Sequence, residues 1–286
     1  MTPLFTCVVP SLNQGRFLRT ALESLFAQGD DLEVIVVDGG STDGSVEILR
    51  EHSSRLAWWC SEADGGQSAA FNKGFAHARG EWLFWLNADD VLLPGALARV
   101  RAVLEGRRDL NPRLEWIAGN ELVIDEGGRI LRCLRGNAWH DGLYRHAVPH
   151  VYGPSSFFTR DLFLAAGGFD ENLRVAMDFD LWIRFMRTQR ARRGRVGFLR
   201  INDYLWAWRM HDGSKTSSET RSREELRRQA QDVARAFSKN DFEVTRGGNL
   251  KMRLWRLLDG SYVRGWMDTR RWKGCSLEDF AEGRCP

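Results

Sequence analysis

The chain has 286 residues, of which 43% are hydrophobic and 28% charged. These proportions are typical of a soluble globular protein with a sizeable core and exclude a disordered chain. The length exceeds the roughly 150 residues of an average domain, so we expect one large domain with an appendage. The net charge of +3 hides an asymmetry, because residues 1–183 carry −8 and residues 184–286 carry +11. The basic part could face nucleic acid, an anionic membrane or a phosphorylated acceptor, or be the solvated surface of helices.

Cysteine usage and apolar runs exclude further classes. The five cysteines lack the CxxC spacing of a zinc site, and their odd, scattered number fits a reducing cytoplasm. Residues 1–10 lack a charged segment followed by a long apolar run, so we expect no signal peptide. The longest apolar runs have about five residues, far fewer than the roughly 20 that span a bilayer. We therefore expect a cytoplasmic protein.

The first 100 residues alternate between apolar runs and helical patterns. Continuous apolar runs predict buried strands over 5–9, 32–37, 56–60 and 82–86. Apolar residues at helical spacing predict helices over 16–27, 45–51 and 68–78, and Pro94 predicts the start of another. This alternation indicates a mostly parallel sheet with helices on both faces. Ligands bind beyond the carboxyl ends of such strands, here in the loops after Val37, Cys60 and Leu86.

The pattern changes from about residue 115. Short strands are predicted over 116–118, 122–124, 130–133, 156–158, 196–200 and 204–208. A turn at 126–128 predicts a hairpin. Helices are predicted over 178–186 and, in the basic last part, over 224–237 and 250–258.

Two of the loops are rich in groups that bind ligands. In residues 37–45, Gly39 and Gly40 allow a close backbone approach, and Asp38 can accept hydrogen bonds from a base or a ribose. A plain strand-to-helix turn capped by Asp and Ser is the alternative. After the strand at 82–86, Asp89 and Asp90 are adjacent carboxylates, which favours a cation such as Mg²⁺ or Mn²⁺ beside them. The alternative is capping of the helix near Pro94.

Two later segments add candidates for chemistry. Asp178 and Asp180 begin a predicted helix, where one could serve as a general base, or both could simply favour the helix dipole. His211 and Lys215 lie in a loop of small residues after a strand. They could bind phosphate or metal, although a lone histidine is more often structural.

Taken together, these segments resemble the inverting family 2 glycosyltransferases of the GT-A fold, in the subgroup with an LNxDD motif. The resemblance rests on order and spacing over residues 4–216. It is carried by Val9-Pro10-Ser11-Leu12-Asn13, residues 37–44, 61–68, Asn72-Lys73-Gly74, 86–90, Leu93-Pro94-Gly95-Ala96-Leu97, 157–158, 167–170, 178–181 and the loop at His211.

The resemblance implies an α/β, GT-A type fold, with a mostly parallel mixed sheet flanked by helices. Residues 1–100 would form a Rossmann-like half that binds the nucleotide sugar, and residues 101–216 the half that binds the acceptor. Residues 217–286 lie outside the resemblance and are expected to form a helical, basic extension that contains Trp. Basic residues with Trp and Leu suit an anionic bilayer, here the inner face of the plasma membrane. Packing on the domain or on a second subunit is the alternative.

The resemblance also implies an activity: transfer of a sugar from a nucleotide diphosphate sugar to the hydroxyl of a glycan or lipid-linked acceptor, with inversion, in bacterial cell-surface polysaccharide or lipopolysaccharide assembly. The donor would be bound by Pro10, Asn13, Asp38, Gly39, Asp64, Asn72, Asn87 and Asp90. Asp89 and His211 would hold Mn²⁺ or Mg²⁺, and Asp178 would be the catalytic base.

Departures from the family pattern leave alternatives open. Asn87 replaces the first Asp of the DxD motif and brings no charge, so a non-catalytic nucleotide-sugar binding module is one alternative. A sugar nucleotidyltransferase is another, but its Gly-rich N-terminal loop is absent. Met177 stands where many members have Glu. No basic-aromatic nucleic-acid module is recognisable, so we expect no nucleic-acid partner.

Overall fold

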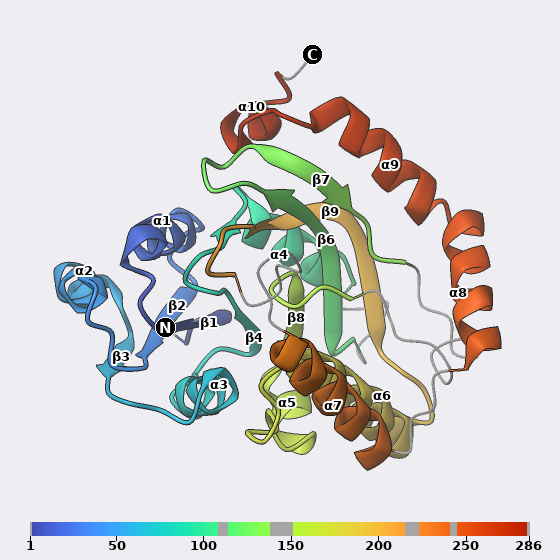
Figure 1. The fold of residues 1–286 in the computed structure, drawn as a ribbon, viewed down its shortest axis with the longest axis horizontal. Coiled ribbons are helices and arrows are strands. Elements are labelled where there is room, and N and C mark those ends of the chain that lie inside the picture. Colours follow the sequence, from blue (N-terminus) through green and yellow to red (C-terminus); the bar gives the residue numbers. More distant parts are fainter. Residues whose placement is uncertain (1, 108–113, 138–150, 215–222, 241–244, 285–286) are drawn as a thin grey trace.

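In a computed structural model of the protein, residues 2–107, 114–137, 151–214, 223–240 and 245–284 are described. They form one nine-stranded mixed sheet surrounded by helices (Figure 1). The strands are β1 (Phe5–Ser11), β2 (Leu32–Asp38), β3 (Trp58–Ser61), β4 (Trp82–Trp85), β5 (Val91–Leu92), β6 (Trp116–Ile124), β7 (Ile130–Leu134), β8 (Ser156–Thr159) and β9 (Phe198–Arg209). Their order is β3-β2-β1-β4-β8-β6-β9-β5, with β7 also paired to β6.

Ten α-helices accompany these strands in the described ranges. They are α1 (Gly15–Phe26), α2 (Ser45–Glu51), α3 (Gln67–Ala76), α4 (Ala96–Arg107), α5 (Arg160–Ala165), α6 (Met177–Arg193), α7 (Arg223–Lys239), α8 (Arg246–Leu258), α9 (Ser261–Trp272) and α10 (Leu277–Glu282). The predicted elements of the first 100 residues are confirmed, with boundaries that differ by one or two residues.

The first half of the sheet is parallel, as predicted. β1 pairs in parallel with β2 and β4, and β2 with β3. Along β1, Val8 faces one hydrophobic core, whereas Cys7 and Val9 face the core on the other side of the sheet. This alternation is the two-residue period of a strand buried on both faces. The parallel pairing brings the carboxyl ends of β1, β2 and β4 to the same edge of the sheet.

In the second half, the sequence prediction divided two long strands into two short strands each, which is wrong. Residues 116–118 and 122–124 belong to one strand, β6, and residues 196–200 and 204–208 belong to one strand, β9. β6 and β9 pair in parallel along their lengths, with register shifts beside Asn120. The predicted hairpin of β6 and β7 is confirmed as an antiparallel pair.

The C-terminal helices pack against the sheet domain (Figure 1). Met252 of α8 is 3% exposed and belongs to the core that contains Trp116 and Trp182. On α9, Gly265 lies so near β7 that an added Cβ would be 3.2 Å from the Cys133 carbonyl oxygen. The Cys133 N–H donates to Thr269 Oγ1 at 2.9 Å. Side chains of α8 and α9 thus contribute to the packing of the sheet domain.

Two further observations concern the membrane and the cysteines. Across the described ranges, we find no helix with the length and apolar character needed to cross a bilayer. Cys7, Cys60 and Cys133 are free thiols. Cys275 is disulfide-bonded, which differs from the free thiols expected for a reducing environment.

Candidate functional site

The loop after β2 is organised by Asp38, whose side chain is fully buried. Its Oδ2 accepts from the amides of Gly40 at 3.1 Å and Ser41 at 2.8 Å, and from Ser61 Oγ at 2.7 Å. Its Oδ1 accepts from Ser41 Oγ at 2.5 Å. The carboxylate therefore fixes the shape of residues 38–41.

The loop after β1 is tied to the same segment. Asn13 has a φ of 52°, and its Oδ1 accepts from the Thr42 amide at 3.0 Å. The Gly15 amide donates to Asp43 Oδ2 at 2.8 Å, across the start of α1. Pro10 is the register partner of Val37 in β2. Asn13 and Pro10 thus lie beside the Asp38 loop.

Asp64, in the loop after β3, completes this group. A Cβ added at Gly39 would lie 3.3 Å from Asp64 Oδ2 and 3.4 Å from a methyl of Leu12. Asp64 is exposed, and its Oδ1 accepts from the Gly66 amide at 2.7 Å. Because a larger side chain at Gly39 would meet Asp64, the glycine keeps the two loops in close contact.

Asn87 and Asp90 form a second group after β4. Gln67 Nε2 donates to Asn87 Oδ1, and Asn87 Nδ2 donates to Asp90 Oδ2, both at 2.8 Å. The Arg209 amide donates to Asp90 Oδ1 at 2.9 Å. Burial, with the neighbouring charge of Asp89, raises the pKa of Asp90 well above its ordinary value. Asn87 therefore supports a buried carboxyl group, which explains how an amide is accommodated at this position.

Asp89 lies directly against His211. His211 Nε2 and Asp89 Oδ2 are 3.0 Å apart, although the residues come from distant loops. The Gly213 amide donates to His211 Nδ1 at 3.2 Å, which puts the proton of a neutral ring on Nε2, facing Asp89. A carboxylate and an imidazole are donors that fit a divalent metal. No third His, Cys, Asp or Glu joins them among the residues that the structure describes.

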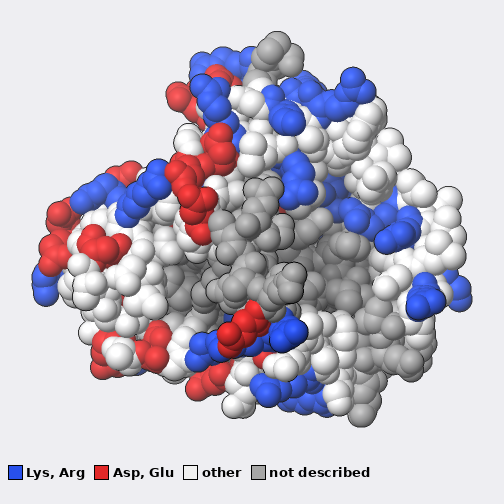
Figure 2. All heavy atoms as spheres, in the orientation of Figure 1, with Lys and Arg blue, Asp and Glu red and all other residues white. Residues whose placement is uncertain are grey.

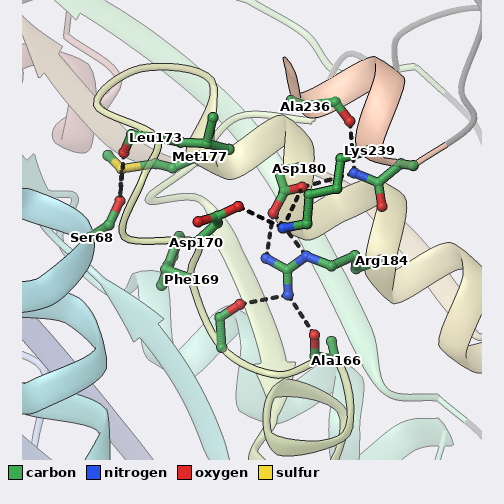
Figure 3. A network of polar contacts seen from close by, with 12 residues as sticks. Ser68, Ala166, Phe169, Asp170, Leu173, Met177, Asp180, Arg184, Ala236 and Lys239 are labelled. Atoms are coloured by element: carbon green, nitrogen blue, oxygen red, sulfur yellow. Dashed lines mark hydrogen bonds and ion pairs between the residues drawn. The ribbon is translucent and has the colours of Figure 1, made fainter. Parts of the chain in front are cut away.

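The two aspartates at the start of α6 have different surroundings, and Figure 3 shows those of Asp180. Asp180 is fully buried, and its Oδ2 accepts from Arg184 Nε at 2.8 Å and Nη2 at 2.6 Å. Its Oδ1 accepts from Asn240 Nδ2 at 2.8 Å, and Lys239 Nζ lies 3.6 Å away. Asp180 is therefore committed to holding α6 and α7 together.

Asp178 is only partly buried, and its Oδ1 accepts from the Phe179 amide at 2.9 Å. Burial by the surrounding protein raises the pKa of Asp178 above its ordinary value. A carboxylate with a raised pKa is a stronger base at neutral pH. Of the two aspartates, Asp178 is thus the one suited to proton transfer.

One predicted position, Asn72, is not brought into these groups, and another cannot be placed. Asn72 uses its side chain within the fold: Nδ2 donates to the Phe169 carbonyl oxygen at 2.9 Å and to Glu171 Oε1 at 2.8 Å, and Oδ1 accepts from the Phe169 amide at 2.8 Å. Both amide protons are occupied, so the geometry gives Asn72 a structural role in place of the predicted donor contact. Lys215 lies outside the described residues.

Comparison with known proteins decides the family. Residues 6–112 match the family described as Glycosyl transferase family 2. The uncharacterized glycosyltransferase MT1564 of Mycobacterium tuberculosis is 31% identical over 188 residues, which cover 64% of this chain and 68% of that protein. The chain belongs to glycosyl transferase family 2. Family membership places the domain in the transferase class, as predicted.

A further relative agrees with this family 2 assignment, and a solved structure shares the fold. The uncharacterized glycosyltransferase RP339 of Rickettsia prowazekii is 28% identical over 194 residues, which are 65% of this chain and 60% of that protein. A mannosyltransferase from Pyrobaculum calidifontis, solved with GDP-Man and Mn²⁺, has a TM-score of 0.57 at 21% identity, over 84% of this chain and 64% of that one. The structural likeness confirms the predicted GT-A fold. The chain spans from 28% to 69% of the lengths of its curated relatives.

Three residues of this family 2 site were not among the predicted ones. Gln67 positions Asn87, and Arg209 Nε donates to the Asp89 carbonyl oxygen at 2.9 Å. Glu121 of β6 is 5% exposed, and burial raises its pKa to about 8. The sequence could have pointed to Arg209 and Glu121, because a charged residue at the end of an apolar strand or within one is unusual.

Proposed function

We propose that this chain transfers a sugar from a nucleoside diphosphate donor to an acceptor hydroxyl with inversion at the anomeric carbon. The observation that carries the proposal is the 3.0 Å contact of Asp89 with His211 at the carboxyl end of the sheet. This is the edge where α/β folds bind ligands. The structurally similar mannosyltransferase from Pyrobaculum calidifontis, solved with GDP-Man and Mn²⁺, supports a nucleotide sugar as the donor.

Asp89 and His211 would hold the divalent metal. When bound, the ion supplies a positive charge that favours departure of the diphosphate. Because no third His, Cys, Asp or Glu lies with this pair in the described ranges, donor oxygens and water would complete the coordination. The Asp38 loop, with Asn13 and Asp64, would bind the base and ribose. Asp90, held by Asn87 and the Arg209 amide, would keep the Asp89 backbone in place.

Asp178 would act as the base. Its carboxylate takes the proton of the acceptor hydroxyl while that oxygen forms a bond to the anomeric carbon. The bond from this carbon to the phosphate oxygen breaks, and the nucleoside diphosphate leaves with the bonding electron pair. A single displacement of this kind inverts the anomeric centre. For the acceptor we propose a glycan or lipid-linked hydroxyl of the bacterial cell surface, on the family resemblance alone.

A thermal-shift panel of UDP, GDP, dTDP and CDP, each with and without Mn²⁺, tests the donor site. A ligand at 100 times its dissociation constant stabilises the folded state by about 2.7 kcal/mol. We expect one nucleotide to raise the Tm strongly, and Mn²⁺ to increase the effect. The same panel on Asp89→Ala should lose the Mn²⁺-dependent part. If no nucleotide raises the Tm, the donor pocket is not functional and the proposal fails.

A further inference from the structure

Helices α8 and α9 place many large apolar side chains at the surface. On α8 these are Leu250, Leu254, Leu257 and Leu258, which are 50% to 81% exposed. On α9 they are Tyr262, Val263, Trp266 and Met267, which are 44% to 58% exposed. In the described part of the chain, Leu12 and Leu164 are the remaining exposed large apolar residues. These eight side chains form what we call the outer apolar face.

The outer apolar face is not the face by which the helices pack on the domain. On α8, Met252 and Trp255 face inward, to the main core. On α9, Gly265 and Thr269 face inward, to β7. The inner contacts fix how the helices lie. On α8 the four exposed leucines share the side opposite Met252 and Trp255. On α9, Val263 and Met267 lie opposite Gly265 and Thr269, while the exposed Tyr262 and Trp266 lie between the two sides. The packing of the fold therefore does not account for the outer apolar face.

Positive charge surrounds this face. Between Arg246 and Lys273, seven Lys and Arg residues are exposed, whereas Asp259 and Asp268 are the acidic residues of that segment. Asp268 is neutralised within the fold, because Arg135 Nε donates to it at 2.7 Å and Tyr204 Oη at 2.6 Å. Figure 2 shows Lys and Arg side chains along the edge where α8 and α9 lie in Figure 1, next to uncharged surface.

We propose that the outer apolar face docks on the surface of an anionic lipid bilayer. Leu, Trp and Met side chains would enter the boundary of the acyl chains, while Lys251, Arg253 and Arg270 reach the lipid phosphates. The centre of a protein interface is instead depleted of charge. Cations distributed along both helices among the apolar residues thus fit a bilayer better than a second copy of the chain.

Flotation with vesicles of phosphatidylcholine, with and without phosphatidylglycerol, tests the proposal on the full chain. We expect binding to the anionic vesicles, weakened by salt. Leu254→Glu and Trp266→Glu, both at exposed positions, should each reduce partitioning roughly ten-fold or more. Leu164→Glu is the matched control, because Leu164 of α5 is 63% exposed but lies outside the face. It should bind like the parent chain.

Three results would overturn the proposal. One is an absence of binding to anionic vesicles at low salt. Another is equal loss in Leu164→Glu and Trp266→Glu. The third comes from light scattering without lipid: a dimer that Leu254→Glu dissociates would assign the face to a second copy of the chain.

Discussion

At the scale of single residues, two aspartates that lie two residues apart at the start of α6 have opposite uses. Asp180 is locked by Arg184 and Asn240, whereas Asp178 accepts one hydrogen bond from its neighbouring amide. We predict that Asp178→Asn abolishes transfer while nucleotide affinity and Tm stay close to those of the parent chain. Steady-state transfer assays and nucleotide titration measure the two. Retained turnover in Asp178→Asn would remove it as the base.

Asp180→Asn is the comparison variant. Removing one partner of a buried, hydrogen-bonded ion pair typically costs about 3–5 kcal/mol of stability. We therefore expect its Tm to fall sharply, which Asp178→Asn should not show. Equal Tm values for the two variants would contradict the separation of roles.

Glu121 gives a prediction about pH. In the folded chain its pKa is about 8, against an ordinary value of 4.5, so between these values the folded state holds a proton that the unfolded state has lost. The free energy of unfolding should therefore fall as pH rises from about 5 to 8. Each pKa unit of the difference corresponds to about 1.4 kcal/mol. Glu121→Gln removes this contribution, so denaturant titrations should show a flatter pH profile than for the parent chain.

Glu105→Gln, an exposed position on α4, is the control for this series. It should keep the parent pH profile. A parent-like decline in Glu121→Gln would place the responsible group elsewhere.

At the scale of elements, α7 holds the segment that carries Asp178. Asp232 Oδ2 accepts from the amides of Arg174 at 3.0 Å and Val175 at 3.2 Å, and Lys239 Nζ donates to Asp170 Oδ2 at 2.6 Å. Asp232→Ala should let the start of α6 move, which lowers kcat by up to roughly 100-fold. The donor KM should stay near that of the parent chain, because the donor pocket lies on the other half of the sheet.

The control for this variant is Glu224→Ala, on the same helix, where Glu224 forms an exposed ion pair with Arg228. It should leave kcat unchanged. Asp232→Asn keeps an acceptor oxygen and should restore part of the rate. An unchanged kcat in Asp232→Ala would show that α7 does not position the base.

The elements also show which parts of the fold a sequence can predict. Both ends of α2 were predicted correctly. The ends of a short surface helix depend on the spacing of its apolar residues and on the turn residues beside it, which are local features of the sequence. β6 and β9 were each predicted as two strands, since Gly119 and Asn120 break one apolar run and residues 201–203 the other. Pairing between the two strands carries the chain through these positions with register shifts. Such pairing joins residues about 80 positions apart in sequence, and a local sequence pattern carries no information about it.

The candidate site likewise has features that were expected from the sequence and features that were not. The contact of Asp89 with His211 was expected from the family resemblance, which assigned both residues to one metal site. The choice between Asp178 and Asp180 could not be made from the residues alone. It depends on Asn240 and Lys239, which lie some 60 residues away and meet Asp180 only in the folded chain.

At the scale of the whole molecule, the C-terminal helices complete the main core. Met252 is 3% exposed and packs into the cluster of Trp116, Phe158 and Trp182. Met252→Ala should therefore destabilise the whole domain by about 2–5 kcal/mol. At roughly 2–4 °C per kcal/mol for a chain of this size, the Tm should fall by about 4–20 °C.

The matched control lies two residues away. Leu250 is 59% exposed on the outer side of α8, so Leu250→Ala should leave the Tm nearly unchanged. Near-ultraviolet circular dichroism, dominated by the buried tryptophans of the sheet domain, should report the same midpoint as backbone unfolding in both variants. If Met252→Ala instead melts α8 alone and leaves the tryptophan signal at the parent temperature, the extension folds separately. Coincident, lowered transitions mean that the basic helices and the sheet domain form one cooperative unit, so that any surface they bind is fixed relative to the active-site edge.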